Sequence, residues 1–148
     1  MENLDTRNNK KVKKKTTSNA GDFTLFKAEA EYWVEKFHLR EWRFLFVHSD
    51  NPDVPNSYAW ILRNPRGRIT TIGLTVSWED EGWEKVSDFN VCKSAFHEIC
   101  ELMLADIIDV AEIDICPTDR VDLETYGHAL IRRLEWAVWE PDYRKRRP

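Results

Sequence analysis

Residues 95–104 read Ala-Phe-His-Glu-Ile-Cys-Glu-Leu-Met-Leu, an apolar stretch that a histidine and a glutamate interrupt one helical turn apart. On an α-helix residues i and i+4 share a face, so His97 and Glu101 project side by side, in line with Leu104. Burying an imidazole and a carboxylate among aliphatic side chains costs free energy unless something compensates them, and a bound cation compensates both. The stretch therefore predicts a central helix, over about residues 89–109, that carries a polar site.

The segments around this helix have the periodicities of an α+β domain. Apolar residues over 23–37 recur every three or four positions, which is typical of an amphipathic helix. Three segments rich in aromatic and β-branched residues follow, separated by turns of Pro, Asn, Asp and Gly, and we expect them to form a three-stranded antiparallel meander. These segments are residues 42–48, 58–62 and 69–78. A C-terminal helix is predicted over about residues 119–139, ended by Pro141.

The 148 residues, 42% of them hydrophobic, suffice for one domain with its own core and are few for two. The basic residues gather at the two ends, above all in Lys10–Lys15 and Arg144–Arg147, and the acidic ones in the middle. We expect a disordered basic arm over 1–21, one domain over 22–140 and a basic tail over 141–148. The basic ends either contact nucleic acid weakly through its phosphates or are solvated tails.

The cysteines and the N-terminal residues bear on the compartment. Cys92, Cys100 and Cys116 are an odd number, and the polar, basic start of the chain lacks an apolar run, so we expect free thiols in a reducing cytoplasm. No stretch approaches the ~20 apolar residues of a membrane span. Cys100 lies near the face of His97 and permits a structural zinc site with another cysteine. Without CxxC spacing, buried free thiols are the favoured interpretation.

The predicted C-terminal helix carries a second polar pair, Glu124 and His128, again four residues apart in an apolar row. Two adjacent helices of this kind can bring His97, Glu101 and His128 to one point. Zn²⁺ takes about four His, Cys or carboxylate ligands, and a catalytic zinc keeps one position for water. We therefore hypothesise a Zn²⁺ site on these three residues, with Glu98 as the general base for water. The alternative is that each histidine pairs only with the carboxylate of its own helix.

The segment His97-Glu98-Ile99-Cys100-Glu101 resembles the HExxH signature of metallopeptidases, with glutamate in place of the second histidine. The order of predicted elements over residues 23–139 is similar to that of minimal zincins, the SprT-like ones above all. Residues 96–102 and 128–135 also resemble small phage and prophage proteins of unassigned role.

This resemblance implies a zinc metallopeptidase with ligands at His97 and His128 and with Glu98 as the base. Glu101 stands where the family has its second ligand histidine. A protein or peptide substrate would lie along the sheet edge beside the helix. A carboxylate ligand makes metal-bound water less acidic, so there is an alternative to an active peptidase. In that alternative the chain is a catalytically inactive, phage-encoded zincin-like module that engages a host protein or nucleic acid.

Overall fold

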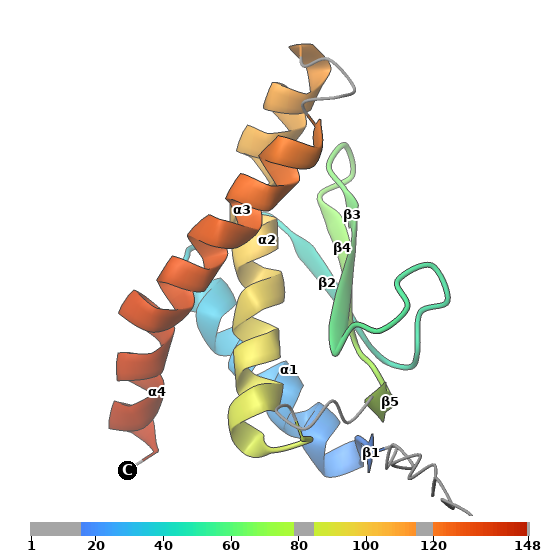
Figure 1. Cartoon of the computed structure of the whole chain (residues 1–148), viewed down its shortest axis with the longest axis vertical. Helices are drawn as coiled ribbons and strands as arrows, with labels where there is room; N and C mark the ends of the chain where they lie inside the picture. The colour runs from blue at the N-terminus through green and yellow to red at the C-terminus, as the bar shows by residue number, and fades with distance from the viewer. Residues whose placement is uncertain (1–15, 79–84, 115–119, 148) are drawn as a thin grey trace, which may run out of the picture.

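The computed structural model describes residues 16–78, 85–114 and 120–147. They form an α+β arrangement of helices and two small sheets (Figure 1). The elements are β1 (Thr16–Thr17), α1 (Ala20–Lys36), β2 (Arg43–His48), β3 (Ala59–Asn64), β4 (Ile69–Leu74), β5 (Ser77–Trp78), α2 (Asp88–Asp114), α3 (Arg120–Leu134), the π-helix η1 (Glu135–Trp139) and α4 (Glu140–Arg146). None of the described helices is long and apolar enough to cross a membrane.

Helix α2 is the central element. It contacts α1, β3, α3 and η1, and Figure 1 shows it between the sheet on one side and the rod formed by α3, η1 and α4 on the other. The helix begins where Ser87 Oγ accepts the backbone N–H of Asn90, a common N-terminal cap. Its side chains Phe96 and Ile99 are fully buried. The prediction of a central helix is therefore confirmed, and the helix extends to Asp114.

Helix α1 starts earlier than the apolar periodicity indicates. The Asn19 side chain accepts the backbone N–H groups of Gly21 and Asp22, while the Asp22 carboxylate accepts that of Asn19, which makes a capping box. Just before it, β1 pairs with the distant β5. The predicted disordered arm is thus wrong for residues 16–21, because polar residues that resemble a disordered segment serve as a cap and a short strand. The rest of that arm lies outside the described residues.

The larger sheet is mixed, and the predicted antiparallel meander is wrong. Its strand order is β2-β4-β3, with β4 antiparallel to β3 but parallel to β2. The hairpin between β3 and β4 forms as expected. Residues 49–58 connect β2 to β3, which lies at the opposite edge of the sheet, and β4 lies between these two strands. Strand β3 therefore lies at the edge of the sheet, against α2.

The C-terminal segment also departs from the prediction. Pro141 does not end the last helix, because the chain continues through η1 into α4 and remains helical to Arg146. A proline inside an α-helix lacks an N–H and clashes with the carbonyl four residues earlier, here in η1. The wider π-turn accommodates that conflict. The predicted basic tail is thus mostly helix.

Candidate metal centre

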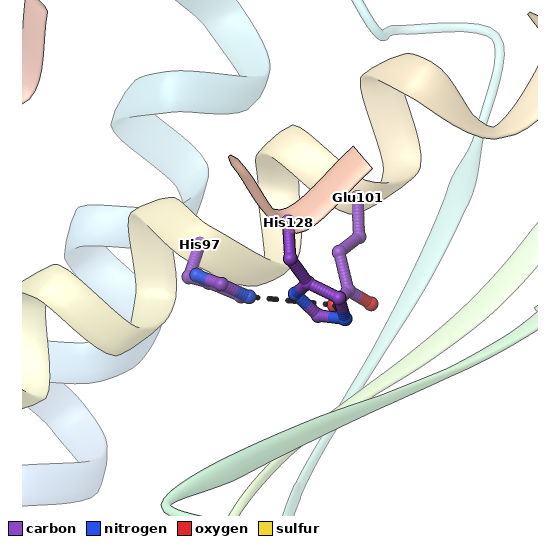
Figure 2. A group of neighbouring side chains, drawn as sticks. All are labelled: His97, Glu101 and His128. Carbon is purple, nitrogen blue, oxygen red and sulfur yellow. Dashed lines mark ion pairs between the residues drawn. The ribbon is translucent and has the colours of Figure 1, made fainter. Parts of the chain in front are cut away.

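Three side chains from two helices converge at one point. Helix α2 supplies His97 and Glu101, and α3 supplies His128; Figure 2 shows the three pointing toward one another. One ligand atom from each lies within 4.8 Å of the others. A metal ion with bonds of ~2.0–2.1 Å in tetrahedral geometry separates its ligand atoms by roughly 3.3 Å. The triad is therefore close to the spacing that a metal requires.

The distances between Glu101 and the two histidines show how the three side chains are arranged. Oε1 of Glu101 lies 3.4 Å from Nε2 of His97 and 3.9 Å from Nε2 of His128. The two imidazole rings are stacked, with their centroids 5.4 Å apart. Glu101 thus lies between two histidines and does not only pair with the one on its own helix. Glu124 takes the predicted position beside His128, with its Oε1 3.8 Å from Nε2, but its side chain is 77% exposed.

A fourth residue, Glu135, contacts His97 and is not among the site residues that the sequence predicts. Its Oε1 lies 2.8 Å from Nδ1 of His97, and the residue is 6% exposed. Its other carboxylate oxygen lies 3.5 Å from Nζ of Lys93. Glu135 is seven residues after His128, on the same face of the helical segment, and that spacing is the signal by which it could have been found.

The hydrogen bond to Glu135 decides which nitrogen of His97 is available. An ionised carboxylate only accepts hydrogen bonds, so Nδ1 carries the proton and donates it to Glu135. Nε2 then faces Glu101 and His128. A carboxylate behind a ligand histidine is the usual arrangement in metal sites, where it fixes the tautomer and the ring orientation.

Without a metal, the pKa values of His97 and Glu135 are shifted in opposite directions. Burial alone lowers the pKa of His97, but the hydrogen bonds to Glu101 and Glu135 outweigh it and raise the pKa to about 10. Burial raises the pKa of Glu135, yet the bond to His97 and the charge of Lys93 prevail and lower it. Protonated His97 thus supplies, next to two carboxylates, the positive charge that a metal ion would bring.

Glu98 lies beside the triad and not in it. Only 7% of the residue is exposed, and it lines the same cavity as the three candidate ligands. Burial raises the pKa of Glu98 to about 8; the charge of Glu101 adds to this rise and that of His97 opposes it. A general base is most effective when its pKa lies near the working pH. Glu98 is therefore a buried carboxyl that can exchange a proton near neutral pH.

The cavity has a volume of about 540 Å³ and is bounded by β3 with the loop before it, by α2, and by α3 with η1. Its wall on the sheet side includes Ala59, Trp60 and Ile61 of the edge strand β3. The triad is therefore accessible to a ligand that approaches along β3.

No protein-family model, curated protein or solved structure matches this chain. The assignment of a function accordingly depends on the geometry of the site.

Proposed function

We propose that the protein is a zinc-dependent hydrolase of the peptidase type, with zinc held by His97, Glu101 and His128. The observation that carries this proposal is the convergence of the three ligand atoms within 4.8 Å at the wall of an accessible cavity. Two histidines and one glutamate are a ligand set of catalytic zinc, and they leave a position for water or substrate. Bound zinc polarises a carbonyl group and lowers the pKa of water.

The surrounding residues support hydrolysis. Glu98 is a buried carboxylate in the same cavity and takes the proton of the attacking water. Glu135 accepts the Nδ1–H of His97 and keeps Nε2 directed to the ligand cluster. The chain's own residues thus supply three metal ligands, a base and a carboxylate that orients one ligand.

The edge strand β3 favours an extended peptide as substrate. It has a hydrogen-bonded neighbour, β4, on one side; on the other side no described strand pairs with it. An extended peptide can add to such an edge through main-chain hydrogen bonds. Residues 59–61 of β3 also line the cavity, so a peptide placed there would pass the triad.

Contact with nucleic acid through the basic ends has less support. Three arginines near the C-terminus form ion pairs within the chain: Arg144 with Glu140, Arg146 with Glu29 and Arg147 with Asp88. Residues 10–15 lie outside the described part of the chain.

The test is metal analysis of protein purified without chelator, followed by assays on a library of unstructured peptides. We expect about one zinc per chain, and loss of zinc in His97→Ala and in His128→Ala. His38→Ala, which changes an exposed histidine away from the cavity, is the matched control and keeps its zinc.

Glu98→Gln separates binding from hydrolysis. It should retain zinc and lose peptide cleavage, since Glu98 is outside the ligand triad. Glu31→Gln, an exposed glutamate of α1, should change neither. Zinc that is absent from the wild-type protein would refute the proposal; zinc that is present without any cleavage would favour the inactive binding module.

A further inference from the structure

Glu135, the partner of His97, is where an unusual helical turn begins. Glu135 is the first residue of η1 and Trp139 the last, and the backbone N–H of Glu140 donates to the carbonyl of Glu135, the i to i+5 bond of a π-turn. Residues four apart in such a turn lie nearly one above the other. Glu135 and Trp139 are accordingly both buried, with 6% and 1% of their surface exposed.

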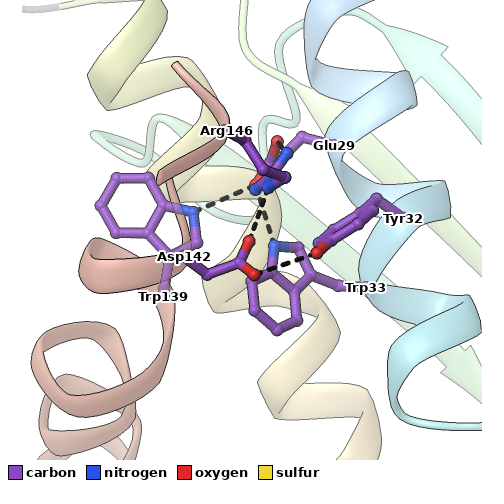
Figure 3. A network of polar contacts seen from close by, with 6 residues as sticks. All are labelled: Glu29, Tyr32, Trp33, Trp139, Asp142 and Arg146. Atoms are coloured by element: carbon purple, nitrogen blue, oxygen red, sulfur yellow. Dashed lines mark hydrogen bonds and ion pairs between the residues drawn. The ribbon is translucent and has the colours of Figure 1, made fainter. Parts of the chain in front are cut away.

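Trp139 belongs to a polar cluster between α1 and the C-terminal segment, which we call the Glu29 cluster (Figure 3). It comprises Glu29, Tyr32, Trp33, Trp139, Asp142 and Arg146. The Glu29 carboxylate accepts Nε1–H of Trp33 at 2.8 Å and Nε1–H of Trp139 at 3.2 Å. Arg146 adds a charged partner, with Nη2 2.7 Å and Nη1 3.1 Å from the two carboxylate oxygens. Glu29 is only 2% exposed, so water has little access to its carboxylate. The hydrogen bonds from these donors therefore stabilise its negative charge.

The cluster also fixes the end of the chain. Arg146 pairs with Asp142 on its own helix, and Asp142 accepts the hydroxyl hydrogen of Tyr32 on α1. Polar contacts therefore attach the segment from η1 through α4 to the rest of the molecule both at His97 and at Glu29.

We propose that Glu135 is a positioning residue for His97 and that the Glu29 cluster keeps Glu135 in place. This inference rests on the proposed function, because the purpose of the positioned histidine is to bind metal. The Nδ1–H to Glu135 bond holds the His97 ring with Nε2 toward the other two ligands. The register of η1 sets where Glu135 lies, and Trp139 and Arg146 fix that register from the other side.

The first test measures metal affinity in Glu135 variants of the full chain. Co²⁺ titration, followed by its visible spectrum, and competition with Zn²⁺ give the dissociation constants. We expect Glu135→Ala to weaken binding by about 10- to 100-fold, the usual effect of removing a carboxylate behind a ligand histidine, and to change the Co²⁺ spectrum. Glu135→Gln should restore much of the affinity, since the amide oxygen still accepts the Nδ1–H.

Glu140→Ala is the matched control, because Glu140 lies on the same segment but its carboxylate pairs with Arg144 and does not belong to the cavity lining. It should bind Co²⁺ as the wild type does. A Glu135→Ala protein with wild-type affinity and spectrum would overturn the positioning role.

The second test is a double-mutant cycle between Arg146 and Glu135. Arg146→Gln should weaken Co²⁺ binding severalfold in the wild-type background and have no further effect in the Glu135→Ala background, because Arg146 acts through Glu135. Arg144→Gln, on the same helix, should have no effect in either. Circular dichroism verifies that each variant is folded at the temperature of titration, and Arg146→Lys serves as a milder variant if Arg146→Gln is not.

The outcomes are distinct. An equal loss in both backgrounds would mean general destabilisation and would overturn the role of the Glu29 cluster. A wild-type protein that binds no Co²⁺ and no Zn²⁺ would remove the proposed function and this inference together. Metal binding that none of the variants alters would overturn this inference alone.

Discussion

Gly73, in the central strand β4, is predicted to tolerate no side chain. A Cβ built there would lie 2.0 Å from Cε2 and 2.2 Å from Cζ2 of the Trp60 indole, far inside van der Waals contact. Trp60 is the cross-strand partner of Gly73 and is 7% exposed, and its Nε1–H donates to the carbonyl of Ser49 at 2.9 Å. The indole therefore cannot move away without losing its packing and this hydrogen bond. Gly73→Ala should strongly destabilise the fold.

The expected cost follows from these contacts. Forcing a methyl group into a packed site costs about 1–3 kcal/mol. Leaving the buried indole N–H without its acceptor costs about 1–3 kcal/mol more. Alanine restricts the unfolded chain and returns about 0.4–1 kcal/mol. The free energy of unfolding should accordingly fall by about 1–6 kcal/mol, a large share of the ~5–15 kcal/mol typical of a domain.

Urea unfolding at equilibrium measures this change. Gly67→Ala is the control, because Gly67 is exposed in the β3–β4 hairpin and a Cβ there meets its nearest atoms at 3.5 Å; it should shift stability by about 1 kcal/mol or less. Replacing the indole in the double variant Gly73→Ala/Trp60→Leu should recover part of the loss, so the two changes are not additive. A Gly73→Ala protein as stable as the wild type, or strict additivity, would refute the steric explanation.

Three further predictions concern other parts of the molecule. The metal-free protein should lose stability as pH rises from about 6.5, where an unfolded histidine titrates, to about 10, where folded His97 releases its proton. Thermal melts at several pH values measure this loss, and His97→Asn should remove part of it. Cys92 and Cys100 should resist alkylation in the folded protein at about pH 8, because both are fully buried and burial raises the pKa of Cys92 to about 12. Peptide mass spectrometry locates any label, and fast labelling of either thiol would contradict this. Ser18→Ala should cost about 1–2 kcal/mol, because its buried hydroxyl bridges a backbone carbonyl and an imidazole, whereas Thr17→Ala, at an exposed position, should leave urea unfolding nearly unchanged.

The site was predictable to the extent that it depends on helical periodicity. The pairs at positions 97 and 101 and at 124 and 128 each lie one turn apart, which places both members on one face whatever the rest of the fold does. The structure brings His97, Glu101 and His128 together as expected. The sheet was less predictable, because alternating apolar residues identify a strand but not its neighbour. The parallel pairing of β2 with β4 therefore became evident only in the folded chain.

The sequence by itself determined the main helices α1, α2 and α3, most of the strand positions and the polar faces of α2 and α3, because these follow from interactions between residues a few positions apart. Only the tertiary structure decided that Glu135 meets His97 and that Arg146 meets Glu29, across 38 and 117 residues of chain. The two contacts lie at either end of the segment that contains the π-turn, and Trp139 in that turn is buried and donates to Glu29 of α1. Such packing depends on the assembled core, so no local pattern of residues specifies it.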